Sequence, residues 1–276
     1  MSLTNEEIER YKRHLVLKDV GGQGQQKLKD SSVLLIGAGG LGSPLLMYLA
    51  AAGVGRIGLI DDDHVSLSNL QRQIAHDTPS INERKVESGR DTIRRLNPNV
   101  EVDTFDERIN AENALDIIAK FDLVADGSDN FATRYLVNDA CYLAKRPLVF
   151  AAVGPFDGYV TTFRGHETGD DGNPKPNYRC IFPVELPEGT VAPCSEIGVL
   201  GAIVGVVGTL QATEVIKELL GIGKSLSGRL LIYDALGARF QNVDIAWNPT
   251  NPLNGENPTI TDLSIHKSEK ISQARG

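Results

Sequence analysis

Short apolar runs alternate with amphipathic segments along the first half of the chain. Strands are predicted at five short runs with few charges: 33–36, 56–60, 100–105, 123–126 and 148–151. Apolar residues at helical spacing predict helices at four places: about 43–53, 82–96, 111–120 and 130–145. Strands that alternate with helices in this way predict an α/β fold with a doubly wound, mostly parallel sheet.

The pattern changes after residue 153. Asp157-Gly158 predicts a hairpin turn into an alternating strand at 159–163, and two later strands at 229–233 and 238–245 complete an antiparallel C-terminal extension. The uncharged stretch 197–213 is shorter than the roughly 20 apolar residues of a membrane-spanning helix, so it predicts a buried helix.

These features predict one domain over residues 1–247, with its core at 33–153. Residues 165–195 are rich in Gly, Pro, Asp and Glu and predict a long mobile loop. From residue 248 onward Pro, Asn, Ser and Lys dominate, so 248–276 is expected to be a poorly ordered tail.

A glycine turn follows the first predicted strand directly. Gly37, Gly39 and Gly42 fit the pattern G-x-G-x-x-G, which allows a tight turn and close approach of phosphates to the start of a helix. The second strand ends at Asp61, nineteen residues after Gly42, where a carboxylate that binds ribose hydroxyls is expected. The sheet is therefore predicted to be Rossmann-like and to bind a nucleotide.

Composition narrows the class of protein. The chain has 276 residues, 41% hydrophobic residues and a net charge of −8, which argues for a globular protein and against nucleic-acid or membrane partners. Its three cysteines form no C-x-x-C pair, and the amino terminus has no signal-peptide pattern, so a cytoplasmic location is expected.

The charged residues bear on which nucleotide is used. A dehydrogenase needs little beyond backbone N–H groups for the pyrophosphate of NAD, whereas attack on the α-phosphate of ATP needs fixed cations and a divalent metal. Arg13, Arg72 and Lys85 could supply the cations. Asp126 and Asp129 lie at the end of the fourth strand, at the sheet edge where ligands bind, and favour the ATP-using alternative.

Several segments together resemble the ubiquitin-activating-enzyme-like adenylyltransferases that activate sulfur-carrier proteins, the MoeB/ThiF/HesA family. The matching segments lie between residues 10 and 240: Arg10-Tyr11-x-Arg13, Gly37-x-Gly39-Gly40-Leu41-Gly42, Asp61-x-Asp63-x-Val65-x-x-Ser68-Asn69-Leu70-Gln71-Arg72-Gln73, Lys85-Val86-Glu87, Asp129-Asn130-x-x-x-Arg134 and Cys194-x-Glu196-x-Gly198-Val199. The segment Ser-Asn-Leu-Gln-Arg-Gln is the most specific of them.

The resemblance implies ATP and Mg²⁺ as cofactors. Gly40 would approach the phosphates, Asp61 would hold the ribose, Asn69, Arg72 and Lys85 would bind the triphosphate, and Asp129 would bind the metal. The nucleotide-binding set that it implies comprises Gly37, Gly39, Gly40, Gly42, Asp61, Asp63, Ser68, Asn69, Leu70, Gln71, Arg72, Lys85, Asp129 and Asn130. The catalytic set comprises Arg13, Arg72, Lys85, Asp129 and Cys194. In this family Arg13 would reach ATP from the neighbouring subunit, so a homodimer is expected.

The substrate implied by the resemblance is a small ubiquitin-like sulfur-carrier protein. Its C-terminal Gly-Gly carboxylate would attack the α-phosphate, giving an acyl-adenylate and pyrophosphate. No rhodanese-like domain is recognised, so the sulfur donor is expected in trans. The carrier and its pathway, molybdopterin, thiamine or another, stay open. Two alternatives also stay open: adenylation of a small carboxylate or a tRNA modification, and a non-catalytic sensor of NAD or another nucleotide.

The cysteines depart from the family pattern. Relatives commonly hold zinc with two C-x-x-C pairs, but the first pair here is Asn177-x-x-Cys180 and no cysteine follows residue 248. No zinc is therefore expected. Cys194 matches a cysteine that some relatives use for a covalent link to the carrier and others do not need, and Cys141 is predicted to lie in the core.

Overall fold

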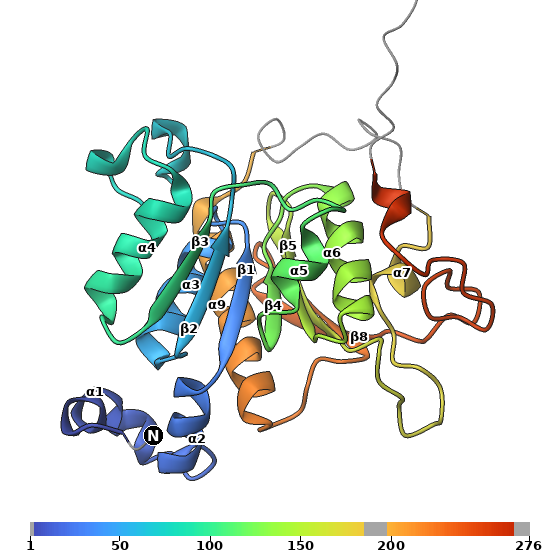
Figure 1. The fold of residues 1–276 in the computed structure, drawn as a ribbon, viewed down its shortest axis with the longest axis horizontal. Coiled ribbons are helices and arrows are strands. Elements are labelled where there is room, and N and C mark those ends of the chain that lie inside the picture. Colours follow the sequence, from blue (N-terminus) through green and yellow to red (C-terminus); the bar gives the residue numbers. More distant parts are fainter. Residues whose placement is uncertain (1–2, 185–197, 268–276) are drawn as a thin grey trace, which may run out of the picture.

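A single sheet organises the described part of the chain. The computed structural model describes residues 3–184 and 198–267 (Figure 1). The strands are β1 (Ser32–Ile36), β2 (Arg56–Ile60), β3 (Glu101–Phe105), β4 (Leu123–Asp126), β5 (Leu148–Val153), β6 (Asp157–Phe163), β7 (Arg229–Asp234) and β8 (Arg239–Asp244). They form an eight-stranded sheet in the order β3-β2-β1-β4-β5-β6-β7-β8.

Both predicted parts of the sheet are present. All pairs from β3 to β5 are parallel, whereas β6, β7 and β8 pair antiparallel. The predicted α/β class, Rossmann-like and doubly wound with an antiparallel C-terminal extension, is confirmed. The strand order reverses between β1 and β4, and such a switch point opens a crevice at the carboxyl ends of the strands.

Helices cover both faces of the sheet. One face carries α3 (Gly42–Ala52), α4 (Lys85–Leu96) and α9 (Gly201–Leu220), and the other carries α5 (Ala114–Ile118), α6 (Phe131–Leu143) and α7 (Tyr178–Ile181). Successive β1 residues alternate between the two cores: Val33 and Leu35 join the first, Leu34 and Ile36 the second. This double burial explains why the strand reads as an unbroken apolar run.

Close contacts fix the glycine turn between β1 and α3. A Cβ at Gly42 would lie 2.1 Å from the carbonyl oxygen of Gly37, so no side chain fits there. Helix α3 ends next to Gly53, close to its predicted end, and the φ of 83° at Gly53 is the left-handed conformation of a C-cap glycine.

The hairpin differs from its prediction by a few residues. Asp157 and Gly158 already belong to β6, and the turn precedes them. The backbone N–H of Gly154 donates to the carbonyl of Asp157 and closes the turn. A Cβ at Gly158 would lie 2.2 Å from Val207, so this glycine lets α9 pack closely on the sheet.

The glycine- and glutamine-rich residues before β1 form a helix that the sequence did not indicate. Helix α1 (Asn5–Leu15) is followed by α2 (Gly21–Lys29), and both lie near the amino ends of the strands (Figure 1). Gln25 is buried and donates to the carbonyl of Ala52, while Lys27 donates to that of Leu220. These tertiary contacts hold a sequence whose glycines disfavour a helix.

From Gly201 onward the uncharged stretch forms a largely buried helix, as predicted, and this helix, α9, continues to Leu220. A Cβ at Gly208 would lie 2.5 Å from Pro44 and 2.7 Å from the carbonyl of Leu41, so α9 touches α3 closely. Among the described residues, no helix is long and apolar enough to cross a membrane.

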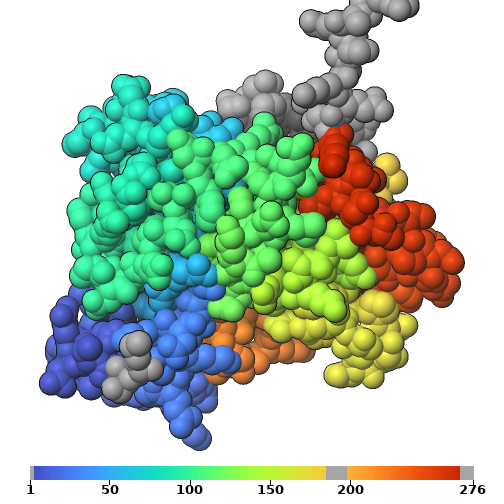
Figure 2. Space-filling view, viewed as in Figure 1, coloured from blue at the N-terminus to red at the C-terminus, as the bar shows by residue number. Residues whose placement is uncertain are grey.

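The C-terminal segment is packed, in contrast to the tail expected from residue 248. Leu253, Ile260 and Leu263 are buried, and the segment lies against α6 and α7 (Figure 2). A short 3₁₀ turn, η3 (Ser264–His266), follows. The sequence suggested disorder because its few apolar residues are widely spaced, yet three of them are buried and Leu263 joins the core on the α6 face. Residues 268–276 lie outside the described chain.

Two groups of polar contacts attach this segment. The side-chain amide of Asn251 donates to Asn177 Oδ1 at 3.0 Å and to Cys180 Sγ at 3.1 Å. Asn254 donates to the carbonyls of Gly165 and Lys175.

The second group surrounds Asp139, which is fully buried. Arg179 forms a bidentate pair with this carboxylate, at 2.8 and 2.6 Å, and His266 Nε2 lies 2.8 Å from it. Burial acts to raise the pKa of Asp139, but hydrogen bonds from Arg179 and His266 outweigh it and lower that pKa.

Candidate active site

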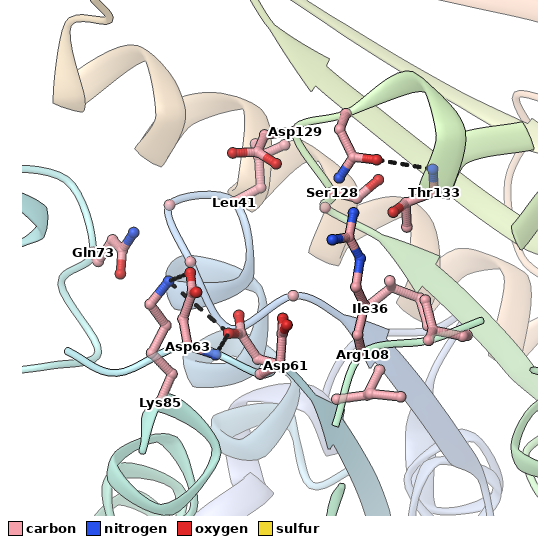
Figure 3. A pocket seen from close by; sticks show the side chains of 18 of the residues that line it. Ile36, Leu41, Asp61, Asp63, Gln73, Lys85, Arg108, Ser128, Asp129 and Thr133 are labelled. Carbon is pink, nitrogen blue, oxygen red and sulfur yellow. Dashed lines mark hydrogen bonds and ion pairs between the residues drawn. The ribbon is translucent and has the colours of Figure 1, made fainter. Parts of the chain in front are cut away.

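A cavity of about 340 Å³ opens at the switch point, beside the carboxyl ends of β1, β2 and β4 (Figure 3). This volume lies in the usual range for small-molecule sites. Four predicted residues from separate parts of the sequence meet there: Asp61, Arg72, Lys85 and Asp129.

The glycine turn forms the floor of this cavity. Gly37 has a φ of 90°, which glycine adopts without strain. Gly39 and Gly40 line the cavity, and a Cβ at Gly40 would lie 2.8 Å from Val204. The turn leads into the amino terminus of α3, where unpaired N–H groups attract anions. Phosphate groups therefore suit this part of the cavity.

Asp61 and Lys85 form the wall on the β2 side. The Asp61 carboxylate accepts the N–H groups of Ala38 and Asp63, at 2.8 and 2.9 Å. Lys85, only 5% exposed, lies 2.7 Å from Asp63 and 3.9 Å from Asp61 (Figure 3). Burial raises the pKa of Asp61, and the Lys85 charge partly offsets this. A cation fixed beside the glycine turn suits a triphosphate better than a simple dinucleotide.

Of the predicted residues Ser68 to Arg72, only Arg72 lines the cavity. Arg72 lines it, with Nη1 donating to the carbonyl of Ser68 at 3.2 Å. The neighbouring residues lie in or just after the 3₁₀ turn η1 (Leu67–Asn69) and are absent from the cavity lining in the described structure: Ser68, Asn69, Leu70 and Gln71. Their predicted roles in nucleotide binding stay predictions.

The loop after β4 forms the opposite wall. The carboxylate of Asp129 lines the cavity, and the side chain of Asn130 caps α6 by accepting the N–H of Thr133 at 2.9 Å (Figure 3). Arg134 donates two hydrogen bonds to the carbonyl of Ser128. The buried Asp126 accepts the N–H of Ser128, and burial raises its pKa. Asp126 therefore supports the loop and does not line the cavity.

One predicted catalytic residue, Arg13, is not found in this cavity, and another, Cys194, cannot be placed. Arg13 belongs to α1, whose Tyr11 contacts Asn97 near the amino ends of the strands. The cavity lies at the opposite edge of the sheet, so Arg13 does not line the site of its own chain. Cys194 lies outside the described residues. The two other cysteines are free, and Cys141 is buried in the core as predicted.

Several residues with polar side chains line the cavity but were not among the predicted site residues, and Gln73 and Arg108 are two of them. Gln73, 5% exposed, lies beside Gly39, and its Oε1 has no hydrogen-bond partner within the described chain. Its position directly after Arg72 in the matching segment could have identified Gln73 as a site residue. Arg108 comes from the loop after β3, and nothing in its local sequence marks it.

Fold and site together define a nucleotide-binding α/β enzyme. A model of the ThiF family matches residues 11–253, and the chain belongs to this family. It is 48% identical to the sulfur carrier protein adenylyltransferase of Thermus thermophilus over 263 residues, covering 95% of this chain and 96% of the relative. It is 48% identical to the adenylyltransferase and sulfurtransferase MOCS3 of Bos taurus and 47% identical to the probable adenylyltransferase/sulfurtransferase MoeZ of Mycobacterium tuberculosis.

The extent of these matches differs. They cover 97% and 91% of this chain but only 57% of MOCS3 and 63% of MoeZ. The chain thus spans about three fifths of those two relatives and nearly all of the Thermus one. This protein is an enzyme of the adenylyltransferase class.

Solved structures show the same fold at lower identity. Escherichia coli MccB with ATP superposes with a TM-score of 0.74 at 21% identity, over 88% of this chain and 74% of that one. The microcin C7 biosynthetic enzyme MccB in complex with N-formylated MccA gives a TM-score of 0.76 at 22% identity, over 89% and 75%.

Proposed function

We propose that this enzyme uses ATP to adenylylate the C-terminal Gly-Gly carboxylate of a small ubiquitin-like sulfur-carrier protein. One observation carries the proposal: Lys85 is held beside Asp61, and Arg72 faces the same glycine-floored cavity. Such a site has cations where a triphosphate would lie and a carboxylate where ribose would lie. The name of the Thermus relative supports the carrier as substrate.

The reaction requires little proton transfer from the protein. An ionised carboxylate oxygen forms a bond to the α-phosphorus, the bond from that phosphorus to the bridging oxygen breaks, and pyrophosphate leaves. Negative charge grows on the phosphate oxygens during this step. Lys85, Arg72 and the N–H groups at the start of α3 would stabilise it, so positioning and electrostatics are the main catalytic contributions.

Mg²⁺ suits this cavity. Asp129 is exposed on the wall opposite Lys85, and no described protein group pairs with its carboxylate, so both oxygens are available to a hard cation. When bound, the ion would neutralise phosphate charge. Asp129 is therefore proposed as the metal residue.

Zinc does not suit the attachment site of the C-terminal segment. The two pairs at spacing i, i+3, Asn177 with Cys180 and Asn251 with Asn254, meet there and offer one thiol and three amides. Zinc requires four thiolate, imidazole or carboxylate ligands. We therefore propose that this enzyme uses no structural zinc and that amide hydrogen bonds replace it.

The proposed working unit is a homodimer. Arg13 lies far from the cavity of its own chain, which fits a role in the site of a partner copy. The sulfur donor is proposed to act in trans, and the location to be cytoplasmic.

Isotope exchange between ATP and pyrophosphate tests the proposal. With Mg²⁺ and a carrier ending in Gly-Gly, the protein is expected to transfer labelled pyrophosphate into ATP. An enzyme that binds NAD in preference to ATP and shows no exchange would contradict it.

A further inference from the structure

The residue at the centre of the glycine turn, Ala38, is held from both sides. Its N–H donates to Asp61 at 2.8 Å, and its carbonyl oxygen lies 2.8 Å from Nε2 of His76. Nδ1 of His76 lies 2.8 Å from the hydroxyl of Ser88 on α4. His76 and Ser88 are 6% and 4% exposed. The imidazole thus connects the glycine turn to the helix that carries Lys85.

The chemistry of these contacts fixes the tautomer of His76. A carbonyl oxygen only accepts, so Nε2 must carry the proton and donate to Ala38. In the neutral ring Nδ1 is then an acceptor, and the Ser88 hydroxyl donates to it. Burial lowers the pKa of His76, which favours this neutral form.

The carbonyl of Ala38 and the N–H of Gly39 belong to one peptide unit. In a trans peptide these two groups point in opposite directions, so the bond to His76 also sets the direction of the Gly39 N–H. Gly39 lines the cavity, and within the described chain its N–H has no hydrogen-bond acceptor. Because residue 39 is a glycine, the inverted peptide would meet little steric resistance.

We propose that His76 is a positioning residue that holds the Ala38–Gly39 peptide with the Gly39 N–H directed at the phosphates of the nucleotide. Without this bond, the peptide can invert and present the Ala38 carbonyl oxygen to the phosphates, replacing attraction with repulsion. The inference rests on the proposed use of ATP at this site.

Equilibrium binding of two ligands to the full-length protein tests this role. ATP with Mg²⁺ needs the phosphate-binding turn, whereas adenosine has no phosphate and serves as the matched ligand. Calorimetry would compare wild type with His76→Phe, which keeps an aromatic ring without a donor, and His76→Gln, whose amide can still donate to Ala38.

His76→Phe is expected to weaken ATP binding about tenfold, the size of one lost hydrogen bond to a charged group, and to leave adenosine binding unchanged. His76→Gln is expected to restore ATP binding to within about threefold of wild type. Equal losses for both ligands, or no loss for ATP, would overturn the proposal.

A second variant, Ser88→Ala, tests the same role in case His76→Phe does not fold. Ser88→Ala keeps the ring and removes the hydroxyl that fixes its tautomer, so a smaller loss is expected, again for ATP and not for adenosine. A loss shared by adenosine would contradict the role. If wild type shows no pyrophosphate exchange while these binding differences hold, the proposed function fails and the role of His76 in phosphate binding stands.

Discussion

The position of Lys85 in the cavity follows from the helix and the strand that carry it and its partner. It starts α4, and β2 ends at Ile60, directly before Asp61, so helix and strand bring the ammonium and the carboxylate to one edge. The sequence motif predicted that Asp61, Arg72, Lys85 and Asp129 would share a site, and the structure brings all four to one cavity. Asp61 and Asp129 directly follow or lie close after strand ends and Lys85 starts a helix, whereas Arg72 was predicted only from the matching segment.

Arg108 and His76 were not predicted for a physical reason. Arg108 reaches the cavity because β3 is the neighbour of β2, and strand order cannot be read from a local pattern. His76 acts through the backbone carbonyl of Ala38, and the sequence carries no signal for such a contact.

The metal residue gives the first prediction. Asp129→Ala is expected to lower ATP–pyrophosphate exchange by at least about a hundredfold, because a metal ligand is lost where negative charge develops. Asp116→Ala is the matched control, since this exposed carboxylate on α5 lies outside the cavity. Exchange near the wild-type rate in Asp129→Ala, with circular dichroism unchanged, would exclude Asp129 as the metal residue.

At the scale of elements, strands were predicted better than the irregular segments. Strand periodicity is local, so all five strands of the parallel part were found within a few residues. Helix α2 was missed because its glycines and glutamines oppose helix formation, and tertiary contacts, among them those with Ala52 and Leu220, stabilise it. The order of the C-terminal segment was also missed, because the side-chain amides that attach it to the rest of the protein leave no local pattern in the sequence.

The amide contacts give the second prediction. Asn251→Ala is expected to reduce the free energy of unfolding by ~1–3 kcal/mol, because the buried Asn177 and the half-buried Cys180 lose their partner. Asn99→Ala, on an exposed loop, is the control and should change it by less than about 0.5 kcal/mol. Denaturant titration measures both, and equal effects would show that the cluster contributes nothing specific.

Metal removal gives the third prediction. The melting temperature of the wild type is expected to be the same with and without a chelator, because no zinc supports the fold. The variant with cysteines at 177, 251 and 254 would present four thiols together with Cys180, and it is expected to take up one zinc per chain. Stoichiometric zinc in the wild type, lost on chelation together with secondary structure, would refute the zinc-free interpretation.

Asp139 gives a prediction about pH. Its pKa is lowered in the folded protein, so its ionised form stabilises the fold above the unfolded pKa of about 3.9, and this contribution is lost as the pH falls through the folded pKa. Asp139→Asn should therefore be less stable than wild type at pH 7, by ~3–5 kcal/mol, because Arg179 loses its buried partner.

The difference between the two proteins should begin to shrink as the pH falls below about 4, where the carboxylate of the unfolded wild type takes up a proton. It should be lost as the pH falls through the lower pKa of the folded carboxylate. Unfolding curves at a series of pH values measure it. A difference that stays constant down to pH 2 would contradict an ionised Asp139 as the source.

At the scale of the whole molecule, the sheet places α1 and the cavity at opposite edges. Arg13 could then reach a nucleotide only in another copy. This gives the fifth prediction: Arg13→Ala and Asp129→Ala are each expected to be inactive, yet mixing them should restore part of the exchange activity. A mixed dimer has one site with both residues intact. Verified heterodimers without any recovery would place Arg13 outside the reaction.

The central claim is that the carboxylate which attacks ATP belongs to the last glycine of a carrier protein. Exchange between ATP and pyrophosphate should be measured with a carrier ending in Gly-Gly and with the same carrier lacking its final glycine. The account predicts rapid exchange with the intact carrier and a loss of at least about a hundredfold with the shortened one, because the carboxylate no longer reaches the α-phosphate. Equal exchange with both carriers, or with none present, would contradict it.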